Sequence, residues 1–158
     1  MLRILLICTG NTCRSPMAEV FLQEKVKKGG LADRIKVLSA GLYAGGESPA
    51  SPGARAAAAR RGLDLAGHRS RQLLPEYVQA ADLVLTMTQS HKSAVKALAP
   101  EAAGKVYSLG EYAGAPGDVP DPFGSGYEEY EACAVVIEEL LNKAWDKIVA
   151  LAGESDPM

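Results

Sequence analysis

A thiol and a guanidinium lie six positions apart in the segment Cys8–Ser15, whose sequence is Cys-Thr-Gly-Asn-Thr-Cys-Arg-Ser. Arg14 supplies a planar pair of donors that matches two oxygens of a phosphate group. Gly10 and Asn11 tolerate a positive φ, so the backbone N–H groups of this turn can point inward toward an anion. The spacing therefore predicts a phosphate-binding loop that carries a nucleophilic cysteine.

Cys8 is the residue expected to attack phosphorus. A helix that begins just after the loop directs the positive end of its dipole at the site, which favours the thiolate form of Cys8. Ser15 can donate a hydrogen bond to that thiolate, both when it forms and when it leaves. We expect an in-line attack that gives a cysteinyl-phosphate while Arg14 and the backbone N–H groups hold the equatorial oxygens. The alternative, a buried cysteine beside an ordinary turn, does not explain why all these residue types fall where one mechanism needs them.

A second segment offers an acid for the leaving group. Residues 117–124 contain Asp118 and Asp121, and prolines on both sides of Asp121 stiffen its backbone. A general acid must be held in position, so Asp121 is the preferred candidate. An Asp-Pro pair by itself is more often a plain turn, and only its combination with the first loop favours the catalytic interpretation.

The composition describes one globular domain. The chain has 158 residues, a formal net charge of −2 and 47% hydrophobic residues, which is enough apolar material for a single core. We expect one domain over residues 1–153 and a flexible tail at 154–158. The near balance of 17 basic and 19 acidic residues gives no bulk charge for holding nucleic acid or anionic lipid.

The apolar runs and the cysteine count bear on location and cofactors. The first apolar run, Ile4–Cys8, is far shorter than a membrane span of about 20 residues or a signal-peptide core, so we expect a cytoplasmic protein that does not contact membranes. Three cysteines do not make a disulfide framework. His68 and His91 lack the spacing of zinc ligands. No metal or other cofactor is therefore expected, and His91 receives no role.

The elements that must position these residues alternate between strand and helix. Strands are predicted at 3–8, 35–39, 83–87 and 105–108, and helices at 15–28, 52–61, 90–98 and about 134–151. Ser15 and Pro16 are interpreted as the N-cap and first residue of the first helix, and residues 110–126 as a functional loop. Each strand except the last precedes a helix. This order predicts an α/β fold with a parallel sheet, helices on both faces and a ligand site beyond the carboxyl ends of the strands.

The sequence resembles the low-molecular-weight protein tyrosine phosphatases, and more closely the bacterial protein arginine phosphatase branch of that family. The resemblance covers essentially the whole chain and rests on motifs at Cys8–Glu19, Ser39–Gly41, His68–Gln72, Ala81–Met87 and Asp121–Pro122. It implies a three-layer sandwich with a four-stranded parallel sheet flanked by helices. It also implies a metal-free, two-step mechanism.

The resemblance further assigns roles to single residues. Cys8 would be the nucleophile, Arg14 the phosphate clamp and Asp121 first acid and then base. A hydrogen-bond network that braces the phosphate loop would consist of Asn11, Ser15, Ser39 and His68. The positions of Ser39 and His68 alone predict no role for either residue.

The substrate class depends on Thr12, whose side chain is expected to line the mouth of the pocket beside the leaving group. Tyrosine phosphatases of the family usually carry isoleucine there, whereas the arginine phosphatases resemble this chain in having threonine. A guanidinium needs acceptors and tolerates a hydroxyl, while a phenol prefers an apolar wall. Phe123 and Gly124 stand where tyrosine-directed members often show paired tyrosines. We therefore predict hydrolysis of protein phosphoarginine, with phosphotyrosine as the alternative.

The other expectations concern the pocket and its redox chemistry. Cys13 is the expected partner of Cys8 in a reversible disulfide that spares Cys8 from overoxidation, a hypothesis that the resemblance supports against a buried, inert thiol. Cys133 is assigned to the core. The residues expected to line the substrate and phosphate site are Thr9, Gly10, Asn11, Thr12, Cys13, Ser15 and Phe123.

Two rival functions remain. Arsenate reductases share a similar loop but need further thiols, generally after the third strand, and Thr86–Leu98 contains no cysteine. A phosphocarrier or an inactive phosphoprotein-binding module is the second rival, which the complete set of Cys8, Arg14 and Asp121 disfavours. The expected partners are phosphorylated proteins, and we expect the chain to be a monomer.

Overall fold

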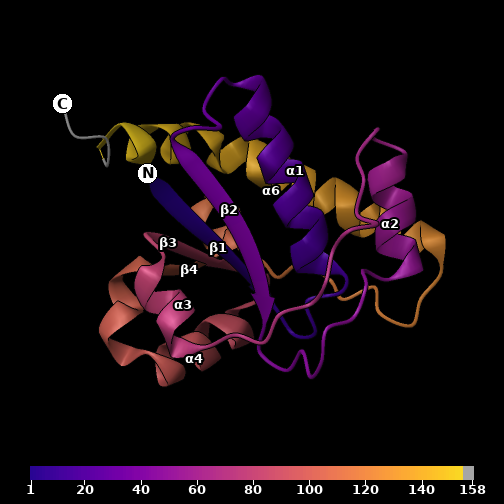
Figure 1. Cartoon of the computed structure of the whole chain (residues 1–158), viewed down its shortest axis with the longest axis horizontal. Helices are drawn as coiled ribbons and strands as arrows, with labels where there is room; N and C mark the ends of the chain where they lie inside the picture. The colour runs from indigo at the N-terminus through magenta and orange to yellow at the C-terminus, as the bar shows by residue number, and fades with distance from the viewer. Residues whose placement is uncertain (155–158) are drawn as a thin grey trace.

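The computed structural model describes residues 1–154 and shows a four-stranded parallel sheet between two layers of helices (Figure 1). The strands are β1 (Leu2–Cys8), β2 (Ile35–Gly41), β3 (Leu83–Thr86) and β4 (Val106–Ser108). The helices are α1 (Arg14–Lys28), α2 (Pro52–Ala59), α3 (Pro75–Ala80), α4 (Gln89–Leu98), the 3₁₀ helix η1 (Pro100–Lys105), α5 (Leu109–Tyr112) and α6 (Tyr127–Glu154). The strand order is β2-β1-β3-β4, with every pair parallel. The predicted three-layer fold is confirmed.

The central strand β1 is buried on both faces, which explains its continuous apolar sequence. Only Arg3 in this strand is exposed, because helices cover both sides of the sheet. Ile4 and Leu6 face the layer of α1, α2 and α6, whereas Leu5 and Ile7 face α3 and α4. The chain passes from β1 to β2 on one side and to β3 on the other. The carboxyl end of β1 therefore lies at the switch in strand order, where such sheets bind ligands.

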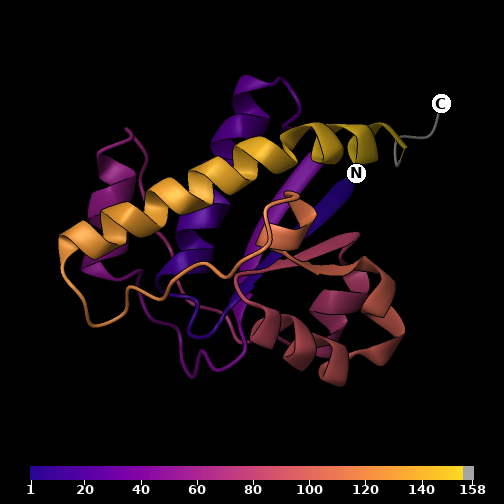
Figure 2. The same cartoon turned by 180° about the vertical axis from the view of Figure 1, so that it is seen from behind.

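Helix α6 crosses the back of the molecule over α1 (Figure 2). The spacing of three and four between apolar residues predicts a packing stripe of Ala134, Ile137, Leu141, Ala144, Ile148 and Leu151, and all of these except the half-buried Leu151 lie on its buried face. The helix continues through Glu154, so the expected tail does not begin at that residue, and residues 155–158 lie outside the described part of the chain. Among residues 1–154, no helix combines the length and apolar character that a membrane span requires.

Two short helices differ from the predicted elements. Helix α3 was not predicted because its six residues bury only Val78, and one buried position shows no helical period. The first three residues of the predicted loop at 110–126 belong instead to α5. The N-cap residue Ser108 and Glu111 form a reciprocal capping box at the start of this helix. The last strand, β4, is therefore followed directly by the helix α5, so every strand of the sheet precedes a helix.

Candidate active site

The predicted phosphate loop lies between β1 and α1, at the carboxyl end of the central strand. Cys8 ends β1 and Arg14 begins α1, and both residues are buried, with exposed fractions of 2% and 4%. The Sγ atom of Cys8 lies 2.9 Å from Oγ of Ser15 in the first turn of α1. The structure thus places the thiol beside a hydroxyl and beside a helix N-terminus.

Ser15 does not cap helix α1, contrary to the prediction. The helix begins at Arg14, and Cys13 precedes it without a capping side-chain hydrogen bond. The Oγ atom of Ser15 accepts a hydrogen bond of 2.8 Å from the side-chain amide of Asn11. Its own O–H is therefore left to donate to Cys8, so the hydroxyl serves the site rather than the helix backbone.

Asn11 joins the loop to three other segments. It is fully buried and adopts a φ of +57°, the left-handed conformation that asparagine tolerates. Its amide also donates to Ser39 Oγ at 2.9 Å, and its Oδ1 accepts from the backbone N–H of Arg71 at 2.9 Å. His68 Nε2 lies 2.7 Å from the Asn11 carbonyl oxygen. The four residues of the expected bracing network are therefore brought together, and the backbone of Arg71, which no sequence pattern marks, joins them.

Strand β2 supports the loop from the side. Ser39 donates to the carboxylate of Glu19 on α1, and no sequence pattern predicts this role for Glu19. A Cβ atom on Gly41 would lie 2.7 Å from the Thr9 carbonyl oxygen and 2.9 Å from the Asn11 backbone nitrogen. Only glycine fits at such a close approach, so the end of β2 can hold the loop in place through its backbone.

The Arg14 side chain spans the floor of the site. Its Nη1 donates to the Val119 carbonyl oxygen at 3.0 Å, and its Nη2 lies 3.5 Å from Thr9 Oγ1. The same Nη2 lies 3.6 Å from Oδ2 of Asp121, whose side chain is 52% exposed. Asp121 Oδ1 accepts the backbone N–H of Phe123 at 3.0 Å. The Arg14 guanidinium is thus held in place by the Val119 carbonyl. The half-exposed Asp121 carboxylate lies at the opening of the site, with one oxygen held by the Phe123 N–H.

These groups surround a cavity of about 190 Å³. Asn11 and Ser15 do not line it, because their side chains lie behind the loop, so two of the expected lining residues contribute support rather than contact. Phe123 is 73% exposed and forms one wall. The lining residues are Cys8, Thr9, Gly10, Thr12, Cys13, Arg14, Asp121 and Phe123.

The second cysteine of the loop is held by helix α6. Cys13 Sγ lies 3.2 Å from Tyr130 Oη and 3.4 Å from Ser51 Oγ, and burial raises the pKa of Tyr130 to about 12. All three thiols are free and buried, so the Cys8–Cys13 disulfide stays a prediction. Cys133 lies in the core beside the Pro120 carbonyl oxygen, and burial raises its pKa to about 12, as suits an unreactive thiol.

His91, which received no role from the sequence, contacts the loop directly. Its Nε2 lies 2.9 Å from Thr9 Oγ1, and its Nδ1 is buried with no hydrogen-bond partner among residues 1–154. Burial, helped by the nearby Arg14 charge, lowers the pKa of His91 to about 4. Both histidines thus brace the loop. No group of three or more His, Cys, Asp or Glu residues within the described chain is placed to hold a metal ion.

The low pKa of His91 predicts a pH-dependent contribution to stability. Between pH 6.5 and about 4, the unfolded chain binds a proton at this residue that the folded chain does not, so the free energy of unfolding falls as the pH falls. The variant His91→Gln should lose less of this free energy between pH 7 and pH 4.5, measured by urea denaturation. An equal loss in both proteins would show that His91 is not held neutral.

A thiol, a guanidinium and a carboxylate line this small cavity, and a hydroxyl behind the loop contacts the thiol. This arrangement is suited to phosphoryl transfer through sulfur. Residues 3–152 match the family model described as low molecular weight phosphotyrosine protein phosphatase. A protein-arginine-phosphatase of Geobacillus stearothermophilus is 40% identical to this chain, over 92% of the chain and 95% of the relative.

Two further comparisons agree on the family. The low molecular weight protein-tyrosine-phosphatase Etp of Escherichia coli K12 is 34% identical, over 91% of this chain and 92% of the relative. The structure of the YwlE arginine phosphatase from Geobacillus stearothermophilus superposes with a TM-score of 0.88 at 38% identity, and covers 100% of this chain and 99% of that one. The chain therefore belongs to the low molecular weight phosphotyrosine protein phosphatase family and is a cysteine-dependent phosphatase.

Proposed function

We propose that this phosphatase hydrolyses phosphoarginine in proteins, with Cys8 as the nucleophile. The observation that carries the proposal is the composition of the cavity wall, where Thr12 and Asp121 both contribute oxygen acceptors. A guanidinium leaving group needs such acceptors for its N–H groups, whereas a phenol gains more from an apolar wall. The arginine-phosphatase relative at 40% identity supports the same substrate.

In the first step the Cys8 thiolate attacks phosphorus in line with the leaving nitrogen. An S–P bond forms and the P–N bond breaks, and the leaving guanidine nitrogen takes a proton from Asp121. Arg14 and the backbone N–H groups of the loop hold the three equatorial oxygens, whose negative charge is also favoured by the α1 N-terminus. Because Arg14 is buried and hydrogen-bonded to the Val119 carbonyl, its guanidinium is already oriented before substrate binds.

In the second step water attacks the cysteinyl-phosphate. The Asp121 carboxylate takes the proton from this water, the S–P bond breaks and inorganic phosphate leaves. The departing thiolate accepts a hydrogen bond from the Ser15 hydroxyl, whose oxygen lies 2.9 Å from Cys8 Sγ. Asn11 holds that hydroxyl in place from the other side, so the same hydrogen bond assists both halves of the reaction.

Phosphotyrosine is the second candidate substrate, since the machinery around phosphorus would be the same. Its support is the tyrosine-phosphatase relative at 34% identity and the exposed Phe123 ring, which could pack against a phenol. The arsenate-reductase interpretation finds no support, because Thr86–Leu98 lacks a cysteine and Cys133 is enclosed within α6.

Exchange of Thr12 tests the substrate assignment. Thr12→Ile should lower the ratio of kcat/KM for phosphoarginine over phosphotyrosine peptides by about tenfold or more, since an acceptor is lost and an apolar wall gained. Thr12→Val is the matched control, because it removes the hydroxyl and keeps the shape. An unchanged ratio in Thr12→Ile would refute a role for Thr12 in substrate selection.

A further inference from the structure

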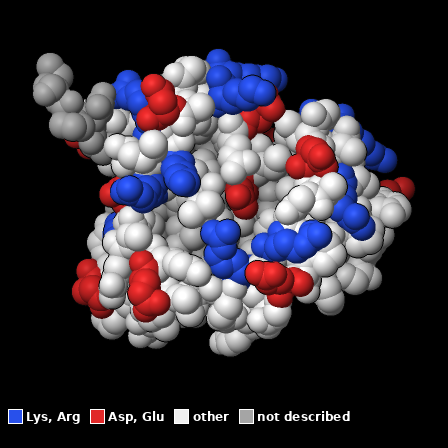
Figure 3. All heavy atoms as spheres, viewed as in Figure 1, with Lys and Arg blue, Asp and Glu red and all other residues white. Residues whose placement is uncertain are grey.

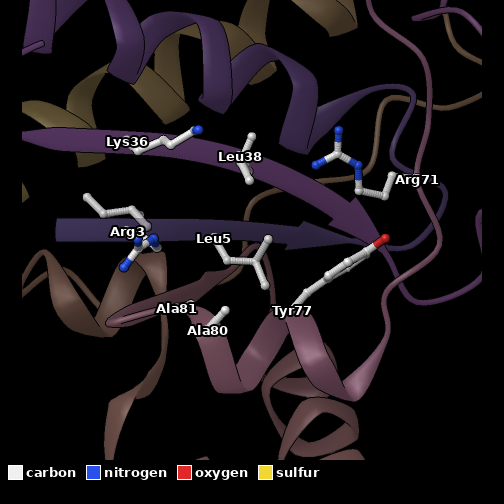
Figure 4. A pocket seen from close by; sticks show the side chains of 9 residues that line it. Arg3, Leu5, Lys36, Leu38, Arg71, Tyr77, Ala80 and Ala81 are labelled. Atoms are coloured by element: carbon white, nitrogen blue, oxygen red, sulfur yellow. The ribbon is translucent and has the colours of Figure 1, made fainter. Parts of the chain in front are cut away.

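The face of the sheet that carries α3 and α4 leaves part of the edge strand β2 uncovered. On the opposite face Ile35 and Val37 are buried in the α1 layer. On this face Leu38 is 39% exposed, and Tyr77 of the neighbouring helix α3 is 37% exposed. Between them lies a groove of about 220 Å³, lined by Arg3, Ile4, Leu5, Lys36, Leu38, Arg71, Tyr77, Ala80 and Ala81 (Figure 4). No step of the proposed reaction uses this groove.

The strand register places like side chains side by side in the groove. Arg3 of β1 pairs with Lys36 of β2, and Leu5 pairs with Leu38. Residues two apart on a strand share a face, so one row is cationic and the next is apolar. Figure 4 shows this cationic row at one end of the apolar floor and Arg71 at the other end.

The cations of the groove lack acidic partners. Within residues 1–154, no ion pair joins Arg3, Lys36 or Arg71 to a carboxylate. The nearby Asp82 accepts the backbone N–H of Arg3 at 2.8 Å. Because like charges directly opposite on neighbouring strands repel each other, an anion between Arg3 and Lys36 would be stabilising. On the α6 side, by contrast, Arg61 is already neutralised by two glutamates.

We propose that this groove, lined by Arg3, Leu5, Lys36, Leu38 and Arg71, docks an acidic segment of a partner protein. An apolar side chain of the segment lies on the two leucines, and flanking carboxylates pair with the cations at both ends. The volume is below the range of about 300–1,000 Å³ of small-molecule sites and suits a single anchoring side chain. Figure 3 shows basic side chains separated by uncharged surface on this face, together with some acidic groups. The attraction for an acidic segment is therefore confined to the groove and does not extend over the whole face.

A designed peptide with a central leucine flanked by glutamates tests this proposal by fluorescence anisotropy and by amide chemical shifts. We expect saturable binding that shifts the signals of Lys36, Leu38 and Tyr77 and weakens at high salt. The double variant Arg3→Glu/Lys36→Glu should weaken binding by about tenfold or more. The control Lys27→Glu/Lys143→Glu has the same charge change on α1 and α6 and should change it by less than about twofold. Should the first variant fail to fold, Arg3→Gln/Lys36→Gln at the same exposed positions replaces it.

The proposal is overturned if the peptide shows no saturable binding, if a glutamine version of the peptide binds equally well, or if both double variants weaken binding alike. Binding of vesicles rich in phosphatidylglycerol that the peptide does not displace would also overturn it, in favour of a lipid surface. None of these readouts involves turnover. The docking groove and the proposed phosphatase reaction can therefore fail independently.

Discussion

Replacement of Cys8 by serine should lower kcat/KM for every phosphorylated substrate by at least about four orders of magnitude. The serine hydroxyl has nearly the size of the thiol, so the loop keeps its contact with Ser15, but a hydroxyl does not ionise at neutral pH to give the attacking anion. Binding of inorganic phosphate, followed by calorimetry, should survive the change because Arg14 and the loop N–H groups remain. The measurement is steady-state turnover of an aryl phosphate and of a phosphoarginine peptide.

Cys133→Ala and Cys13→Ser are the controls for this result. Cys133 is 2% exposed on α6, and burial raises its pKa to about 12, so its loss should leave the chemical step in place. The Cys13 thiol donates to Ser51 Oγ and lies 3.2 Å from Tyr130 Oη, and it makes no hydrogen bond with Ser15 among the described residues. Turnover that persists in Cys8→Ser and disappears in Cys13→Ser would show that the nucleophile has been assigned to the wrong thiol.

Replacement of Asp121 by asparagine should cost about two to three orders of magnitude in kcat/KM for phosphoarginine or phenyl phosphate, because kcat/KM reports the step in which the leaving group departs. Asparagine keeps an oxygen that can accept the Phe123 N–H, held at 3.0 Å in the protein, but it has no proton to give the leaving group. The loss should shrink to about tenfold or less for nitrophenyl phosphate, whose leaving group needs little protonation. This dependence on the leaving group distinguishes an acid from a residue that only shapes the pocket.

Asp118 provides the matched control. It lies three positions earlier in the same loop, and its carboxylate accepts the Gln89 backbone N–H at 2.9 Å rather than facing Arg14. Asp118→Asn preserves that acceptor and should retain most of the activity. A larger loss in Asp118→Asn than in Asp121→Asn would exchange the roles of the two residues.

Features encoded within a few neighbouring residues could be predicted from the sequence. The apolar run of β1 predicts a strand buried on both faces, and the eight residues from Cys8 to Ser15 contain the proposed nucleophile, the proposed phosphate clamp and the turn between them. The left-handed φ of +57° at Asn11 follows from its residue type. Asp121 could be chosen only because the chemistry of the first loop requires an acid.

Contacts between distant segments could not be predicted. His91 is 82 positions from Thr9, Val119 is 105 from Arg14 and Tyr130 is 117 from Cys13. Each of these contacts arises where packing brings two elements together, and no local pattern marks it. The N-cap interpretation of Ser15 failed for a related reason, because its hydroxyl is used by Cys8 and Asn11 rather than by its own helix.

The most direct test of the substrate assignment is kcat/KM on matched phosphoarginine and phosphotyrosine peptides, with Cys8→Ser as the blank. The acceptor-lined wall formed by Thr12 and Asp121 predicts a preference for phosphoarginine of about tenfold or more. A preference for phosphotyrosine would contradict the substrate assignment, while turnover of neither peptide above the blank would contradict the proposed nucleophile as well.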